Sequence, residues 1–191
     1  MISFYRCKPY TMEYLFNSPH FNYRLISPSD SEEFIRIYTN DILMQHISDP
    51  ISEAEAVSLF DRFLRLNDTS HQKHYLFAIE DKVTLNLLGF CGVNAKKNGR
   101  TSRVKIGEIG VMVKEKAMGR GVGTEALNAL VNYCFNKLGY DKLIGPPSPN
   151  NIASIKMLEK VGFKKETVLK SHLTIKGEPI DAPLYVICNS S

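Results

Sequence analysis

Three glycines alternate with other residues within residues 119–123, between an apolar run and a helical pattern. Glycine has no side chain to hinder approach, so the backbone N–H groups of such a turn can converge on an anion at the start of the next helix. Lys114, Lys116 and Arg120 add positive charge around the turn. A strand, a glycine turn with basic neighbours and a helix together predict a phosphate-binding site.

Two common phosphate-binding patterns do not match this turn. A P-loop ends in Gly-Lys-Ser or Gly-Lys-Thr, whereas Gly123 is followed directly by Thr124 with no lysine between them. A dinucleotide fingerprint has the spacing Gly-x-Gly-x-x-Gly near the first strand of a βαβ unit, whereas this turn is Gly-x-Gly-x-Gly and follows several strands. A third kind of phosphate site is left, beside the alternative of a purely structural turn.

Residues 118–123, Met-Gly-Arg-Gly-Val-Gly, resemble the acyl-coenzyme A diphosphate loop of the GNAT superfamily of N-acyltransferases, Gln/Arg-x-x-Gly-x-Gly/Ala. Residues 151–163 are similar to the second motif of that superfamily, Asn-x-x-Ser-x-x-x-Leu-x-x-x-Gly-Phe. Residues 24–30 and 170–185 resemble the opening and the ending of its RimJ/RimL-like branch. The resemblance extends over roughly residues 22–188, with the motifs in the order and spacing of the family.

The resemblance implies an α/β protein with the GNAT fold, in which helices flank both faces of a mixed, mostly antiparallel central sheet. It implies an N-acetyltransferase that moves acetyl from acetyl-coenzyme A to a primary amine by direct attack in a ternary complex, without a metal. The acceptor would be a protein N-terminus, a polyamine or other small amine, or an amino sugar. A coenzyme A-binding module without efficient turnover is the alternative, because Met118 replaces the usual Gln or Arg and Leu158 stands where other members have a tyrosine acid.

The cofactor-binding residues follow from the same resemblance. Backbone amides of residues 119–124 would bind the diphosphate at a helix start, aided by Arg120. A strand that ends at Val113 and diverges from its neighbour would leave main-chain groups of Val111 and Val113 free for the pantetheine amides and the oxyanion. The complete set is Val111, Met112, Val113, Met118, Gly119, Arg120, Gly121, Val122, Gly123, Thr124, Asn151 and Ser154.

Two residues are the expected catalytic groups. Glu108, on the strand before the glycine turn, would take the proton of the ammonium group, directly or through water; the alternative is a glutamate that pairs with a basic neighbour or is exposed. Ser154 would donate a proton to the departing thiolate, or would be an ordinary first-turn helix serine. Asn151 is expected first as a helix cap and second as a contact to the pantetheine arm.

Three further side chains are weaker candidates for the wall of an acceptor pocket. They are His74, Tyr75 and His172, and a structural role is the alternative for each of them. No serine or cysteine lies in a recognisable nucleophile elbow, so a covalent acyl-enzyme is not expected. Direct transfer between the two substrates is therefore the predicted route.

The elements that must position these residues can be read from periodicity, caps and turn residues. The expected order is β-α-α-β-β-β-α-β-α-β-β, with antiparallel strands in the middle that argue against a doubly wound fold. Glycines in the third long strand indicate a bulge or a close approach of other atoms. Strands are expected at residues 23–26, 75–79, 87–93, 104–113, 141–144, 164–173 and 182–187, helices at 31–38, 52–66, 122–138 and 152–161, and a turn or short helix at 41–47.

Length and composition bound the class of protein. The 191 residues, with 43% hydrophobic and 23% charged side chains, predict one globular domain over residues 1–191, in which residues 1–20 form a possible N-terminal extension. No apolar stretch is long enough to cross a bilayer, and the first residues lack the pattern of a secretory signal. A cytoplasmic protein without a membrane partner is expected.

Cysteines and net charge add further limits. Cys7, Cys91, Cys134 and Cys188 fit no metal or disulfide spacing, and the last three lie in apolar patterns that predict buried positions. The net charge is +4, and the loop at residues 96–103 holds a local cluster of Lys and Arg. That cluster is either a solvated loop or a local attraction for a small polyanion. Nucleic acid is not an expected partner, because no continuous basic stripe is present, whereas a homodimer formed through a sheet edge is plausible.

Overall fold

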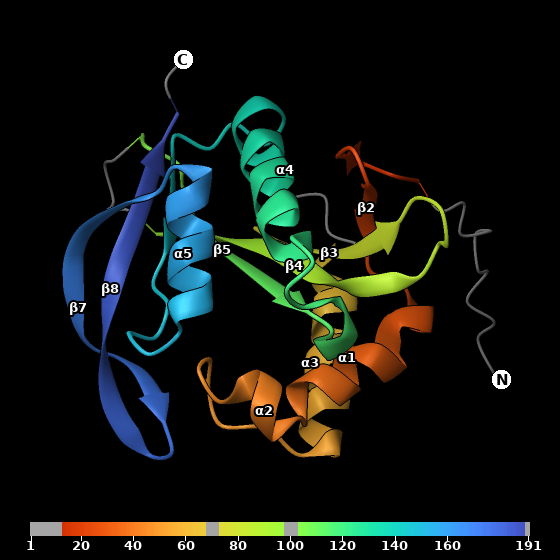
Figure 1. The fold of residues 1–191 in the computed structure, drawn as a ribbon, viewed down its shortest axis with the longest axis horizontal. Coiled ribbons are helices and arrows are strands. Elements are labelled where there is room, and N and C mark those ends of the chain that lie inside the picture. Colours follow the sequence, from red (N-terminus) through yellow and green to blue (C-terminus); the bar gives the residue numbers. More distant parts are fainter. Residues whose placement is uncertain (1–12, 68–72, 98–102, 190–191) are drawn as a thin grey trace, which may run out of the picture.

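The computed structural model describes residues 13–67, 73–97 and 103–189 (Figure 1). Its strands are β1 (Phe16–Asn17), β2 (Phe21–Leu25), β3 (His74–Asp81), β4 (Leu87–Lys96), β5 (Ile106–Val113), β6 (Lys142–Gly145), β7 (Lys164–Ile175) and β8 (Glu178–Cys188). Its helices are α1 (Ser31–Tyr38), α2 (Asp41–Met44), α3 (Glu53–Asn67), α4 (Val122–Asn136) and α5 (Ile152–Val161), with 3-10 turns η1 (Pro28–Asp30) and η2 (Glu115–Ala117).

The described strands form one eight-stranded sheet in the order β1-β2-β3-β4-β5-β6-β8-β7. Neighbouring strands are antiparallel except for the pair β5 and β6, which is parallel. This arrangement confirms the predicted mixed, mostly antiparallel sheet. No helix in residues 13–67, 73–97 or 103–189 is both long and apolar enough to span a membrane.

Helices cover both faces of the sheet, as the sequence predicts. The larger hydrophobic core lies between the sheet and the pair α4 and α5, and a smaller core lies between the opposite face and α1 and α3. Figure 1 shows α4 and α5 side by side on one face, with α1, α2 and α3 gathered at the other side. The two faces of β5 therefore meet different sets of helices.

The helix after the glycine turn illustrates how local sequence sets an element. Val122, Ala126, Leu127 and Leu130 recur at helical spacing on α4, and all four are buried in the larger core. Gly139 follows the helix with a φ of 67°, a left-handed conformation that glycine adopts without strain. The predicted helix is confirmed and ends at Asn136 rather than at residue 138.

The sheet opens between β5 and β6. The two strands pair only where Ile106–Glu108 faces Lys142–Ile144. Beyond this point β5 continues to Val113, whereas β6 ends at Gly145 and is followed by Pro146 and Pro147. Proline cannot donate to a sheet ladder, so the two prolines end the pairing and leave one side of β5 without a neighbouring strand.

The phase of the ladder decides which main-chain groups face this opening. The N–H of Lys114 donates to the carbonyl of Leu88 on the β4 side at 2.9 Å. The carbonyl of Lys105 accepts from the N–H groups of Asp141, just before β6, and of Lys142, its first residue. Because groups alternate along an antiparallel ladder, Met112 directs its N–H and C=O toward β4. Val111 and Val113 direct theirs toward the opening, as the divergence expected from the sequence requires.

Three details differ from the expectations. The short strand β1 lies within the expected N-terminal extension, of which residues 1–12 are outside the described part of the chain. Strand β8 begins at Glu178 rather than at residue 182, because Lys176 and Gly177 form a two-residue turn with φ of 54° and 75°. Cys91 and Cys134 are buried as predicted, but Cys188 is exposed at the end of β8, and Cys7 lies outside the described residues.

Of the two glycines in the third long strand, Gly107 has a packing role, whereas a Cβ on Gly110 would have no heavy atom within 4 Å. The pairing of β4 and β5 has no shift in register, so the predicted bulge is absent there. The alternative, a close approach of other atoms, is confirmed at Gly107. A Cβ there would lie 2.6 Å from Val93 Cγ2 and 2.9 Å from Tyr140 Cε1.

Candidate active site

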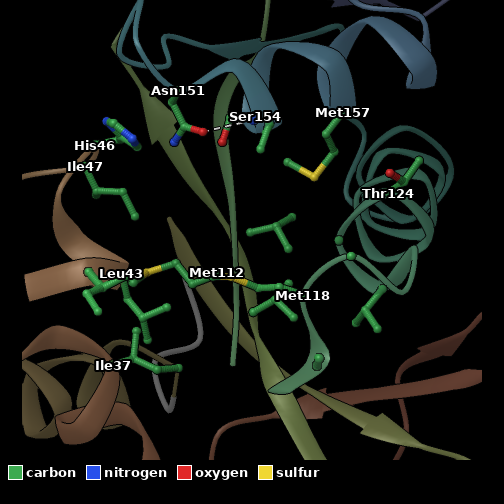
Figure 2. Close-up of a pocket in the computed structure, with 18 of the residues that line it drawn as sticks. Ile37, Leu43, His46, Ile47, Met112, Met118, Thr124, Asn151, Ser154 and Met157 are labelled. Atoms are coloured by element: carbon green, nitrogen blue, oxygen red, sulfur yellow. Dashed lines mark hydrogen bonds between the residues drawn. The ribbon is translucent and has the colours of Figure 1, made fainter. Parts of the chain in front are cut away.

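A cavity of about 540 Å3 occupies the opening beside β5, between α2, α5 and the start of α4 (Figure 2). Two predicted site residues are absent from its wall, Arg120 and Glu108. The cavity brings together most of the predicted set, namely Val111, Met112, Val113, Met118, Gly119, Gly121, Val122, Gly123, Thr124, Asn151 and Ser154. Residues that are more than 40 positions apart in the sequence therefore meet at one site.

The glycine turn at the cavity has the geometry of an anion cradle. Gly119 and Gly121 have φ of 70° and 80°, and a Cβ on either of them would have no heavy atom within 4 Å. Gly121 caps α4, whose first internal hydrogen bond runs from the N–H of Glu125 to the carbonyl of Gly121 at 3.0 Å. The N–H groups of residues 122–124 therefore have no helical carbonyl, and open space lies over the turn.

Gly123 has a different requirement, because it lies inside the first turn of α4. A Cβ on Gly123 would lie 3.1 Å from the Met157 sulfur and 3.5 Å from Val113 Cγ2. The small residue therefore lets α4 and α5 approach each other beside the end of β5. This close packing fixes the start of α4 relative to the strand.

Charged side chains near the cradle are largely engaged elsewhere. Lys114 Nζ lies 2.8 Å from Glu33 Oε2 on α1, so its charge is shared with that carboxylate. Glu125 would oppose an anion, but Ser18 Oγ and the His20 N–H donate to its Oε1 at 2.6 and 2.9 Å. Burial acts to raise the pKa of Glu125, and these hydrogen bonds nevertheless hold it below its usual value. The exposed Arg120 remains beside the turn.

The start of α5 presents Asn151 and Ser154 to the cavity. The Ser154 N–H donates to Asn151 Oδ1 at 3.0 Å, so the predicted cap is confirmed. No hydrogen bond of Ser154 Oγ is found in the part of the chain that the structure describes. Figure 2 shows both side chains across the cavity from Ile37 and Leu43. Leu158 is buried, and as the sequence shows it carries no acid group.

A second cavity of about 270 Å3 adjoins the first and contains Glu108 in its wall. Ser154 and Met112 line both cavities, so the two spaces meet beside them. Lys96 Nζ lies 2.6 Å from Glu108 Oε2, which has no partner with hydrogen-bond geometry among the described residues. Glu108 therefore has the basic neighbour of the structural alternative, Lys96. It also borders an internal space that Ser154 lines, as a proton acceptor in the site would require.

The other acceptor-side candidates have mixed outcomes. His172 lines the second cavity, as expected. His74 and Tyr75 line neither cavity: His74 Nδ1 is 3.0 Å from Asn94 Oδ1, and the Tyr75 ring stacks on that of Phe77. Their alternative, a structural role, agrees with these contacts.

Sequence reasoning placed the helices of residues 31–66 on the acceptor side, but it did not identify which of their residues form the wall. Its members are Ile37, Ile42, Leu43, Gln45, His46 and Ile47. Helix α2 has only four residues, which is too short for a periodic pattern to indicate its inner face. The nearest sequence signal is Asn40, whose side chain accepts from the N–H groups of Ile42 and Leu43 and starts that helix.

The arrangement has the parts that acyl transfer from a phosphorylated thioester requires. Unpaired N–H groups face an open space suited to a diphosphate, and a strand edge with free main-chain groups leads from it. The hydroxyl of Ser154 borders both cavities, and the carboxylate of Glu108 borders the second. The described residues contain no cluster of three or more His, Cys, Asp or Glu side chains that could hold a metal ion.

Comparisons with known proteins agree with this geometry. The family model of the acetyltransferase (GNAT) domain matches residues 20–164. The chain is 30% identical over 156 residues to the uncharacterised N-acetyltransferase p20 of Bacillus licheniformis. The aligned region covers 76% of this chain and 84% of that protein. The two chains are therefore similar over most of their lengths.

Solved structures show the same fold. A spermidine N-acetyltransferase from Vibrio cholerae, in complex with coenzyme A and spermine, aligns with a TM-score of 0.75 and 20% identity over 90% of this chain and 96% of that one. RimL, a ribosomal L7/L12 α-N-protein acetyltransferase in complex with coenzyme A, aligns with a TM-score of 0.77 and 17% identity over 92% and 98%. At these identities the likeness concerns the fold.

Proposed function

Because the chain belongs to the GNAT acetyltransferase family, we propose that it transfers acetyl from acetyl-coenzyme A to a primary amine by direct attack in a ternary complex. Family membership itself makes it an acetyl-coenzyme A-dependent acyltransferase. The observation that carries the amine proposal is the meeting of two cavities at Ser154 and Met112, one beside the anion cradle and one beside Glu108. The donor would lie along β5 and the start of α4, and the acceptor would lie on the α1 and α2 side of the larger cavity and in the second cavity.

The donor would occupy the side of the larger cavity that is formed by β5, α5 and the start of α4. Its diphosphate would lie over residues 119–124, where the helix start and the left-handed glycines leave N–H groups open. The pantetheine amides would pair with the free main-chain groups of Val111 and Val113, in place of the missing strand. This path places the thioester near the junction of the two cavities. The same N–H row can stabilise the oxyanion, for which one donor is worth about 3 kcal/mol.

Glu108 and Ser154, which line the second cavity and both cavities respectively, would carry the proton transfers. Glu108 accepts a proton from the ammonium group, and the neutral nitrogen then attacks the thioester carbon to form a tetrahedral intermediate. When the carbon–sulfur bond breaks, Ser154 donates its hydroxyl proton to the thiolate and regains a proton from the attacking nitrogen, directly or through water. Neutral amide and free coenzyme A leave, and Glu108 returns its proton to solvent. Asn151 holds the backbone of Ser154 by its cap, so it would act as a positioning residue.

Within the family, we place the chain in the RimJ/RimL-like branch. The support is the resemblance at residues 24–30 and 170–185, together with the fold likeness to RimL. The competing proposal is a coenzyme A-binding module without efficient turnover, motivated by Met118, whose side chain is exposed at the cradle, and by Leu158 in place of a tyrosine.

A thiol-release assay tests the proposal directly. The full chain is mixed with acetyl-coenzyme A and a panel of amines that includes small monoamines, spermidine, an amino sugar and short peptides with different first residues. Amine-dependent release of free thiol supports the transferase. Calorimetric binding of coenzyme A without release from any amine would support the module, and the lack of any binding would contradict both.

The first prediction concerns the hydroxyl of Ser154. We expect Ser154→Ala to lower kcat about 100-fold, because general acid catalysis contributes 10²–10⁴-fold, and to change the Kd for coenzyme A less than about threefold. Steady-state kinetics and calorimetry give the two values. Ser58→Ala, at an exposed serine of α3, is the matched control and should keep full activity. An unchanged kcat in Ser154→Ala would leave Ser154 with a capping role only.

The second prediction concerns the carboxylate of Glu108. We expect Glu108→Gln to lower kcat/KM mainly at low pH, where the amine is protonated and needs a base. The measurement is a pH–rate profile of both proteins between pH 6 and about 9.5. Glu166→Gln removes another lysine-paired carboxylate, 3.0 Å from Lys142 Nζ and outside the two site cavities, and should leave the profile unchanged. A parallel downward shift at all pH values would remove Glu108 from the proton transfer.

A further inference from the structure

The acceptor side of the site is predominantly apolar. The α1 and α2 segments present Ile37, Ile42, Leu43 and Ile47 to the larger cavity, and Met112 adds its side chain from β5. Ile42 and Ile47 are 65% and 39% exposed, so this apolar surface continues to the rim. Exposed aliphatic side chains at the edge of an internal space mark a binding surface for an apolar group.

Charge is scarce on the same walls. Among the described residues that line the two cavities, Glu108 is the single carboxylate, and Lys96 already lies 2.6 Å from it. No described lysine or arginine lines either cavity. The remaining titratable side chains are His46 and His172, which supply no negative charge. The walls therefore offer one counter-charge to an incoming cation.

The walls are also tied together at the outer end. The N–H of Lys176, in the turn between β7 and β8, donates to Asp49 Oδ1 at 2.5 Å. Asp49 lies two residues after Ile47, and Lys176 lies three residues after Leu173, a residue of the second cavity wall. Segments 127 positions apart in the sequence therefore meet near the acceptor side.

Resting on the proposed function, we propose that the acceptor is a small primary amine with a single positive charge and an apolar body. Its ammonium group faces Glu108, and its apolar part packs on Ile47, Met112 and their neighbours. A second or third ammonium group, as in a polyamine or a polyamino sugar, would enter an apolar wall without a counter-charge, which is unfavourable. Ile47 is then a specificity-determining residue, since it lines both cavities and remains partly exposed.

The test compares acceptors of the full chain at fixed acetyl-coenzyme A. We expect kcat/KM for 3-methylbutylamine to exceed that for spermidine, for a polyamino sugar and for a short peptide by at least tenfold. Equal or higher kcat/KM for any of these three would overturn the inference while leaving the proposed function intact. Thiol release from no amine, with coenzyme A binding measured by calorimetry, would instead overturn the proposed function and the inference with it.

A charge placed on the apolar wall gives an independent readout. In Ile47→Asp the added carboxylate should raise kcat/KM for spermidine about tenfold and lower that for 3-methylbutylamine, with no change in the Kd for coenzyme A. Val57→Asp is the matched control, since Val57 is 42% exposed on α3 and lines neither cavity. It should preserve the ratio of the two kcat/KM values. An unchanged ratio in Ile47→Asp would contradict the role of this wall.

Discussion

Alanine at position 121 is expected to weaken coenzyme A binding about 10- to 100-fold. Gly121 has a φ of 80° and caps α4, and the space above it is open, so an added Cβ would enter the volume proposed for the diphosphate. A hydrogen bond to a charged group is worth about 1.5–3 kcal/mol, and the loss of one such bond corresponds to this change in affinity. Calorimetric titration of coenzyme A into Gly121→Ala measures the effect.

Backbone strain must be separated from the loss of the binding site. Gly139, after α4, also has a left-handed φ of 67° and open space around its Cβ position, but it lies outside the two cavities. Gly121→Ala and Gly139→Ala should each lower the free energy of unfolding by about 1 kcal/mol, because both place alanine in a left-handed conformation. Gly139→Ala should leave the Kd for coenzyme A unchanged. Equal affinities of the two variants would show that the cradle does not hold the diphosphate.

Elements with a local signal in the sequence were the most predictable. Helix α5 spans residues 152–161 as expected, because Asn151 caps its start and Gly162 ends it with a φ of 106°. The residues of the cradle were also identified from the sequence, since their spacing is itself the feature that leaves the turn open. Both cases depend on short-range chemistry, in which a few neighbouring residues determine the backbone path.

Features created by tertiary contacts were not predictable in the same way. His46 and Ile47 follow a four-residue helix, and the packing of α2 against α1 brings them to the site. The start of β8 was placed too late, because Pro179 argues against a strand interior. In the structure β6 pairs only with Tyr185–Cys188, so Pro179 lies where one edge of β8 is free and its missing N–H has no cost.

The resemblance at residues 24–30 has a physical basis that the sequence alone does not show. Arg24 and Asp30, at the two ends of that segment, form a bidentate ion pair with distances of 2.7 and 2.8 Å. Arg24 also donates from Nε to Glu80 Oε1 at 2.7 Å. The three side chains are 4%, 3% and 5% exposed, so they form one buried charged network. Despite burial, the two carboxylates keep the pKa of Arg24 above its usual value.

Arg24→Met is therefore expected to lower the free energy of unfolding by about 3–5 kcal/mol, because it leaves Asp30 and Glu80 as buried charges without their partner. For a chain of this size the Tm should fall by about 10 °C, as measured by calorimetry or circular dichroism.

Arg36 provides the matched control for this change, since it also bridges two carboxylates, at 2.7 and 3.0 Å, but its side chain is 59% exposed. Glu32 is solvated and Glu33 keeps Lys114 as a partner at 2.8 Å, so Arg36→Met should cost less than about 1 kcal/mol. If both variants lost the same stability, burial would not explain the role of Arg24.

The network also has a functional consequence: Asp30 accepts from the Ser27 N–H at 2.7 Å and precedes α1, which carries Ile37 into the site. Partial unfolding of Arg24→Met should therefore raise KM for the amine before it affects coenzyme A binding.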